Sequence, residues 1–139
     1  MKNEIRVIIA GSRDFSDYDL LKRTLAKRQQ SLEDVTIISG TARGADRLGE
    51  RFAMEHNLKL VRMPADWDRY GKRAGYLRNV AMAEYASGAT GVLYAFWDGC
   101  SKGTQHMINV ARKYGLEVHV IKCGLSGEGL GSYGEEEIL

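Results

Sequence analysis

Two glycine-rich segments of the chain combine small residues with arginine, which suits the binding of anions. Glycine lets a backbone approach a ligand closely, and backbone N–H groups at a helix start attract anions. Arginine adds a planar fork that binds phosphate or carboxylate. The alternative is a pair of tight turns with surface arginines, in which Asp46 caps a helix rather than accepting a hydrogen bond from a ribose hydroxyl. The candidate residues are Gly11, Ser12 and Arg13 in the first segment, and Gly40, Ala42, Arg43, Gly44 and Asp46 in the second.

Two further segments add aromatic rings and hydroxyl groups. The connection from Pro64 to Gly75 is the longest in the body of the chain, and another glycine-rich segment follows Trp97. Aromatic and cationic side chains in one loop can stack a base and neutralise a phosphate. The structural alternative is that Trp67 only closes the edge of the core. The candidate residues in and after these segments are Asp66, Trp67, Lys72, Arg78, Asn79, Asp98, Gly99, Ser101, Gly103 and Thr104.

Other kinds of site find less support in the residue spacing. The dinucleotide fingerprint G-x-G-x-x-G and the P-loop signature G-K-[ST] are both absent. The three histidines, His56, His106 and His119, lack the spacing of metal ligands, so we expect no metal ion. Cys100 lies near a lysine that could activate its thiol. Because no histidine is predictably placed to serve this thiol, we do not expect nucleophilic catalysis.

The elements that must position these residues alternate along the chain. Four segments with helical spacing separate apolar runs; the first begins after Ser16 or Asp17, and the others end near Asn57, before Gly88 and at Gly115. Such alternation predicts an α/β fold with a parallel sheet covered by helices on both faces. Ligands bind such sheets at the carboxyl ends of the strands, where all four candidate segments lie. The five strand-like runs are Ile5–Ala10, Val35–Ser39, Lys59–Met63, Gly91–Trp97 and Glu117–Lys122.

Length and composition indicate an ordinary globular domain. The chain has 139 residues, of which 44% are hydrophobic and 27% charged. Four of the 18 acidic residues and none of the 20 basic ones lie in 123–139, so residues 1–122 have an excess of six basic residues. That excess favours anionic partners, although a solvated basic surface is the simpler explanation. We expect residues 1–122 to form a single domain and 123–139 a glycine-rich acidic tail.

The expected location of the protein follows from what the sequence lacks. The first residues lead straight into a strand-like run without a signal peptide, and no apolar run is long enough to span a membrane. The two cysteines, Cys100 and Cys123, form no disulfide framework. These observations favour a cytoplasmic protein without a membrane partner.

Taken together and in this order, the motifs resemble the YspA-like branch of the SLOG superfamily, which also includes DprA and the LOG-type phosphoribohydrolases. The resemblance covers residues 5–121. It implies a Rossmann-like three-layer α/β/α fold with strand order 3-2-1-4-5, a cleft between the ends of strands 1 and 4, and ligands that are nucleotides or nucleotide derivatives. The motifs are Gly11-Ser12-Arg13-Asp14-Phe15, Gly40-Thr41-Ala42-Arg43-Gly44-Ala45-Asp46, Pro64-Ala65-Asp66-Trp67, Gly71-Lys72-Arg73-Ala74-Gly75, Arg78-Asn79 and Gly103-Thr104.

The chain departs from the enzymes of this superfamily around their acid–base motif, where the loop is two residues longer and Cys100-Ser101 replaces a pair of glycines. Those enzymes use an arginine, which Arg78 resembles, and a glutamate three residues after a threonine. Here the second position is Met107, and a thioether can neither activate water nor stabilise a developing positive charge. The resemblance therefore implies that the ligand-holding parts are present and the acid–base part is not.

The resulting expectation is a sensor or sequestering module for a nucleotide-derived ligand, ADP-ribose-like or cyclic, without a cofactor and without a catalytic residue. The alternative is a phosphoribohydrolase that cleaves the N-glycosidic bond of nucleoside monophosphates with Arg78 and Asp98. A DprA-like binder of single-stranded DNA is a third, less favoured reading, so nucleic acid is not the expected partner. The sequence leaves a homo-oligomer open.

Overall fold

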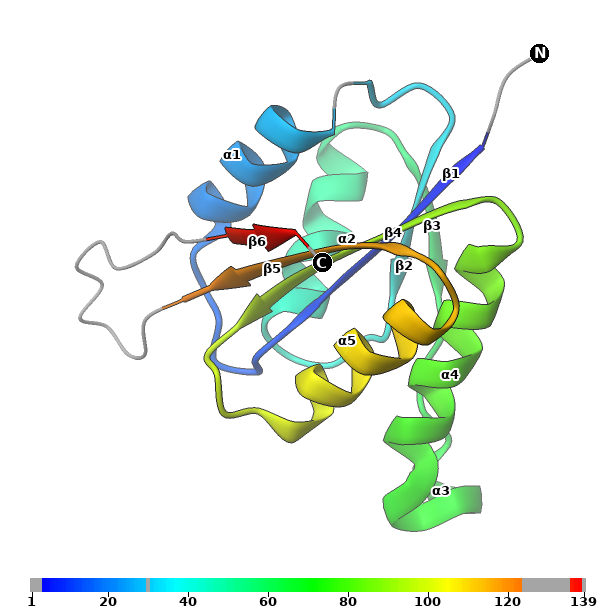
Figure 1. Cartoon of the computed structure of the whole chain (residues 1–139). Helices are drawn as coiled ribbons and strands as arrows, with labels where there is room; N and C mark the ends of the chain where they lie inside the picture. The colour runs from blue at the N-terminus through cyan, green and yellow to red at the C-terminus, as the bar shows by residue number, and fades with distance from the viewer. Residues whose placement is uncertain (1–3, 30, 124–135, 139) are drawn as a thin grey trace.

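The centre of the protein is a six-stranded sheet. A computed structural model describes residues 4–29, 31–123 and 136–138. Along the sheet the order is β3-β2-β1-β4-β5-β6, and β1 to β5 are all parallel (Figure 1). The predicted order of the five parallel strands is therefore confirmed. The strands are β1 (Ile5–Gly11), β2 (Val35–Ser39), β3 (Lys59–Arg62), β4 (Thr90–Trp97), β5 (Glu117–Lys122) and β6 (Glu136–Ile138).

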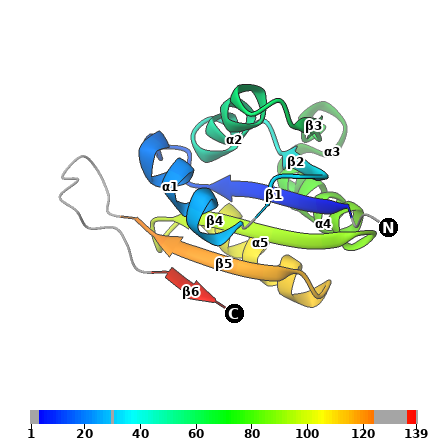
Figure 2. The same ribbon diagram turned by 90° about the horizontal axis from the view of Figure 1, so that it is seen from above.

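Strand β6 is an addition to the predicted sheet. It lies at the outer edge of the sheet and pairs antiparallel with β5, with Glu137 opposite Val120 (Figure 2). Three residues are too few for an alternating pattern to indicate a strand, so the sequence did not predict it. The remaining residues of the predicted tail beyond Cys123, 124–135 and 139, lie outside the described residues.

Helices cover both faces of the sheet, as predicted. The helix α3 is a single turn inside the long connection that the sequence analysis treated as a loop, and a 3₁₀ turn (Gly71–Arg73) joins it to α4. Asp17 caps α1 by accepting a hydrogen bond from the N–H of Leu20 at 3.0 Å. Among the described residues, no helix is both long and apolar enough to cross a membrane. The helices are α1 (Tyr18–Arg28), α2 (Ala45–Glu55), α3 (Trp67–Tyr70), α4 (Ala74–Ser87) and α5 (Lys102–Lys113).

Two apolar layers hold the helices against the sheet. Side chains of a strand point alternately to its two faces. Val7, Ile9 and Tyr94 belong to the cluster that includes residues of α1 and α2, whereas Ile8 and Leu93 belong to the cluster that includes residues of α4 and α5. All five are at most 1% exposed. Burial on both faces explains why the strands appear in the sequence as continuous apolar runs.

Gly49 determines how closely α2 lies against β1. A Cβ atom at this position would lie 2.8 Å from Cβ and 3.0 Å from Cγ2 of Ile9. Ile9 is 1% exposed, so it has little room to move away. The absence of a side chain at Gly49 therefore allows the first turns of α2 to lie beside the carboxyl end of β1.

We predict that Gly49→Ala destabilises the protein by about 1–3 kcal/mol, because the added methyl group overpacks the contact with Ile9. This loss outweighs the gain in helix propensity of up to about 1 kcal/mol that the substitution otherwise brings. Gly103→Ala is the matched control, since a Cβ at Gly103 in α5 would meet nothing within 4 Å. Urea unfolding measures both variants. A Gly49→Ala protein at least as stable as the wild type would contradict the close packing of α2 on β1.

Candidate functional site

The segments after β1, β2 and β4 are hydrogen-bonded to one another at the carboxyl edge of the sheet. The N–H of Ser12 donates to the carbonyl of Phe96 at 3.0 Å. The hydroxyl of Ser12 accepts from the N–H of Asp98 at 3.2 Å. The carbonyl of Ser12 accepts from the N–H of Ala45, at the start of α2, at 3.4 Å. Ser12 therefore connects three of the four candidate segments.

Two neighbouring cavities lie at this edge. The first has a volume of about 230 Å³ and the second about 380 Å³. They share Arg13, Ala42, Trp67 and Arg78, which therefore lie at the junction between them. The predicted residues that line the first cavity are Gly11, Arg13, Ala42, Asp46, Trp67, Lys72, Arg78, Asn79, Ser101, Gly103 and Thr104. Gly40 and Arg43 line the second cavity.

Five predicted residues, Ser12, Gly44, Asp66, Asp98 and Gly99, line neither cavity. Gly44 has a φ of 86°, and a Cβ there would lie 2.3 Å from the carbonyl oxygen of Ser12. Asp66 is exposed and caps α3 through a 3.1 Å hydrogen bond from the N–H of Arg69. In the structure, these two residues shape the loops around the cavities.

Asp98 is occupied by the backbone of its own loop. Its carboxylate accepts hydrogen bonds from the N–H groups of Cys100 and Ser101, both at 2.7 Å. Gly99 lies inside this turn with a φ of 85°. Partial burial raises the pKa of Asp98, but the backbone donors outweigh it and hold the pKa below its usual value. Asp98 is therefore a carboxylate that organises the start of α5.

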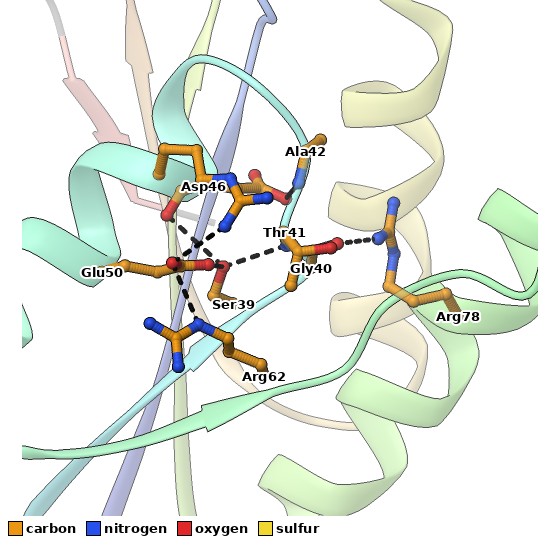
Figure 3. A network of polar contacts seen from close by, with 9 residues as sticks. Ser39, Gly40, Thr41, Ala42, Asp46, Glu50, Arg62 and Arg78 are labelled. Atoms are coloured by element: carbon orange, nitrogen blue, oxygen red, sulfur yellow. Dashed lines mark hydrogen bonds and ion pairs between the residues drawn. The ribbon is translucent and has the colours of Figure 1, made fainter.

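Glu50, which the sequence analysis did not single out, holds the loop between β2 and α2 (Figure 3). It is 3% exposed and accepts a hydrogen bond from the hydroxyl of Ser39 at 2.7 Å. Arg62 of β3 and Arg47 of α2 donate to the same carboxylate at 3.1 and 3.2 Å. Burial raises the pKa of Glu50, but the hydrogen bonds from Ser39 and Arg62, together with the charge of Arg47, lower it overall. A signal existed in the sequence: Glu50 lies one helical turn after Asp46, on the same face.

The same network holds Thr41 in an unfavourable conformation. Its φ is 66°, which a β-branched residue rarely adopts and which costs about 1–3 kcal/mol. The N–H of Thr41 donates to the hydroxyl of Ser39 at 3.0 Å. Backbone strain of this kind occurs mostly where a loop must present groups in a fixed geometry.

Asp46 places a buried carboxyl group at the first cavity. It is 5% exposed and accepts a 3.1 Å hydrogen bond from the N–H of Ala42, so it bonds the loop before α2. Burial raises the pKa of Asp46 to about 6, while the Ala42 N–H and the charge of Arg78 limit the rise. Asp46 and Glu50 do not form part of a metal cluster: within the described ranges, no group of three or more His, Cys, Asp or Glu residues could hold a metal ion.

Two cations, Arg13 and Arg78, line both cavities, and hydrogen bonds hold Arg78 in place. Its Nε donates to Oδ1 of Asn79 at 3.1 Å, and its Nη1 donates to the carbonyl of Gly40 (Figure 3). A Cβ at Gly40 would lie 2.6 Å from Nη1 of Arg78 and 2.8 Å from Oδ2 of Asp46, so a larger residue would displace the ends of these two side chains. A guanidinium has five N–H groups. Among the described residues no further group accepts a hydrogen bond from Arg78, so three of its N–H groups have no acceptor there.

The remaining walls are aromatic and apolar. Trp67 is 52% exposed and lines both cavities, so it does not close the core. Its ring lies over Gly75, where a Cβ would approach Cη2 of Trp67 to 3.3 Å. Met82 and Met107 are 2% and 1% exposed and form part of the first cavity's lining. Met107 is thus both a core residue and an apolar wall, at the position where the resemblance places a carboxylate.

Comparison with known proteins identifies the family and the fold. The profile of the YspA, cpYpsA-related SLOG family matches residues 5–70. The Gene 61 protein of Mycobacterium phage D29 is 37% identical over 119 residues, which cover 81% of this chain and 93% of that protein. The chain belongs to this SLOG family. The crystal structure of DNA processing protein A (DprA) from Streptococcus pneumoniae superposes with a TM-score of 0.63 at 18% identity. The match covers 84% of this chain and 49% of DprA, so the chain corresponds to about half of that protein. At this identity the likeness supports the fold.

We predict that Asp46→Asn changes the pH dependence of stability. Between about pH 4 and 6 the folded protein keeps a proton on Asp46 that the unfolded chain loses, so the contribution of Asp46 to the free energy of unfolding falls as the pH rises. Relative to the wild type, Asp46→Asn should therefore gain stability between pH 4 and 6.5, by up to about 3 kcal/mol. Urea unfolding at several pH values measures this. A stability difference that stays constant across the window would contradict the burial of a titrating carboxyl.

Proposed function

We propose that the protein binds a nucleotide or nucleotide-derived ligand at the carboxyl edge of the sheet and acts as a sensor or sequestering module. The observation that carries this proposal is Arg78. Its guanidinium is fixed by hydrogen bonds to Asn79 and Gly40, and Arg78 lines both cavities. Three of its N–H groups have no hydrogen-bond acceptor among the described residues. Arg13 lies at the same junction, so two cations flank the point where the cavities meet.

Each part of the proposed ligand has a matching part of the site. Arg13 and Arg78 suit a phosphate or diphosphate at the junction. The start of α5 supplies the backbone N–H of Gly103 for the same charge, whereas the N–H of Thr104 already donates to the hydroxyl of Ser101 at 3.4 Å. Trp67 offers an exposed ring on which a base can stack. A phosphate at the junction would direct the two ends of the ligand into different cavities, which favours an ADP-ribose-like molecule over a free phosphate.

A second candidate, a phosphoribohydrolase, rests on one observation. Asp46 is a buried carboxyl in the first cavity, near Arg78, with its pKa raised to about 6. Asp98, the carboxylate expected to serve such a reaction, lines neither cavity and bonds two backbone N–H groups. We favour binding without turnover because Met107 occupies the position of the catalytic glutamate in the enzymes that the chain resembles.

We predict that Arg78→Ala and Arg13→Ala each weaken binding of ADP-ribose about 10- to 150-fold, since each removes a charged hydrogen-bonding partner of the phosphates. Isothermal titration calorimetry measures the dissociation constants. Arg112→Ala, an exposed arginine in the last turn of α5 that lines neither cavity, is the control and should bind as the wild type does.

Two outcomes would count against this proposal. If both cavity variants bind ADP-ribose as tightly as the wild type does, the ligand lies elsewhere. If binding of an oligonucleotide is tighter and falls steeply with salt, with a slope that matches several phosphates, the partner is nucleic acid. Mass spectrometry of small molecules released from the heat-denatured protein provides an independent check on the identity of the ligand.

We predict that the wild-type protein releases no adenine from AMP or ADP-ribose. General acid–base assistance contributes about 10²–10⁴-fold to such reactions, and Met107 supplies neither a charge nor a proton. Liquid chromatography of long incubations measures free base. Release that disappears in Asp46→Asn but persists in Asp98→Asn would contradict this prediction and make Asp46 the carboxylate of a hydrolase.

A further inference from the structure

His106 of α5 contacts the site without lining either cavity. Its Nδ1 lies 3.1 Å from Nδ2 of Asn79, and its ring packs on the ring of Tyr76 at a centroid distance of 4.4 Å. Asn79 and Tyr76 both belong to α4 and line the first cavity. Neither the sequence motifs nor the function proposed above gives His106 a role.

The side-chain amide of Asn79 has a partner at each end. It is 6% exposed. Its Nδ2 donates to the carbonyl of Gly103 at 3.3 Å and faces Nδ1 of His106, and its Oδ1 accepts from Nε of Arg78. An amide nitrogen only donates, so Nδ1 of His106 must carry a lone pair. The imidazole is therefore neutral, with its proton on Nε2.

The contact with His106 determines which atom of the Asn79 amide faces Arg78. With Nδ2 turned towards His106, Oδ1 is the atom that faces Nε of Arg78. A protonated His106 has N–H groups at both ring nitrogens and repels the amide N–H. Asn79 then loses that partner, and the fixed position of the Arg78 guanidinium between Oδ1 and the Gly40 carbonyl loses part of its support.

We propose that His106 is a positioning residue: its neutral imidazole orients the Asn79 amide and thereby holds Arg78 in the conformation that binds the ligand's phosphate. Protonation of His106 releases this orientation and weakens the binding of anions. The statement about binding rests on the proposed function, whereas the coupling between His106, Asn79 and Arg78 exists in the protein without ligand.

The surroundings of His106 favour its neutral form. Burial lowers its pKa. From α4 it faces Tyr76, and Arg78 beyond Asn79. Lys102 precedes it by one turn on α5. No described carboxylate pairs with His106. Protonation of Asp46, which lines the first cavity, has the opposite effect on affinity: it removes a negative charge and so strengthens the binding of an anion.

Two variants separate these contributions. His106→Asn places an oxygen, Oδ1, at the same number of bonds from the backbone as Nδ1, so it keeps the acceptor and cannot be protonated. His106→Leu removes the acceptor and keeps an apolar side chain. The resonance of the Arg78 Nε–H in NMR spectra, followed from pH 7.5 to 5 without ligand, reports the coupling directly. The dissociation constant of ADP-ribose, whose diphosphate does not titrate in this range, reports its effect on binding.

Because Asp46 titrates in the same pH range and its charge acts on Arg78, both measurements are made in an Asp46→Asn background. In that background we expect the Arg78 Nε–H resonance to move with the titration of His106 and to stay constant when His106→Asn is added. Binding of ADP-ribose should weaken about two- to tenfold there as His106 becomes protonated. At pH 7.5, His106→Leu should show the same loss and His106→Asn should not. An Arg78 resonance that titrates equally in His106→Asn would overturn the proposal, as would wild-type affinity in His106→Leu. If the wild type fails to bind ADP-ribose while the resonance behaves as expected, the proposed function fails and the positioning role stands.

Discussion

The hydrogen bond between the Ser39 hydroxyl and the buried Glu50 carboxylate fixes the loop on which the candidate site is built. A buried carboxylate is stable only when it is fully bonded, and Glu50 meets that condition through Ser39, Arg47 and Arg62. Because Ser39 ends β2 and Glu50 lies in α2, their bond fixes the turn between them. That turn presents the Gly40 carbonyl to Arg78, so Arg78 is positioned by a network in which Ser39, Glu50 and Arg62 line neither cavity.

The sequence predicts features that depend on neighbouring residues better than features that depend on residues far apart along the chain. The parallel strands, their order and the helices on both faces follow from local apolar patterns and the family resemblance, and the structure confirms them. The sequence also indicated which segments meet at the carboxyl edge. It did not indicate the role of Glu50, because a glutamate in an amphipathic helix usually faces solvent, and only the fold shows that three donors surround it. Nor could three residues of β6 be distinguished from a loop, because an edge strand is determined by its partner.

The relation to DprA illustrates what a shared fold determines. A parallel sheet with this strand order places its ligand cleft at the carboxyl ends of the strands, whatever the ligand is. The residues at that edge determine the chemistry. In this chain Met107 is an apolar wall of the first cavity, and Asp98 is engaged by the backbone of its own loop. The other groups at this edge are the cations Arg13, Lys72 and Arg78, the buried carboxyl of Asp46 and the exposed ring of Trp67.

Within the site, the charges of Arg78 and Asp46 compensate each other. Arg78 is partly buried, which lowers its pKa, and the charge of Asp46 opposes that effect. Asp46 in turn is kept partly ionised by the charge of Arg78. An anion bound to Arg78 would replace Asp46 as the counter-charge, and its own negative charge would favour the protonated form of Asp46. Binding of an anion at this junction would therefore be coupled to uptake of a proton by Asp46. In the protein without an anion, the charge of Asp46 compensates the partly buried Arg78.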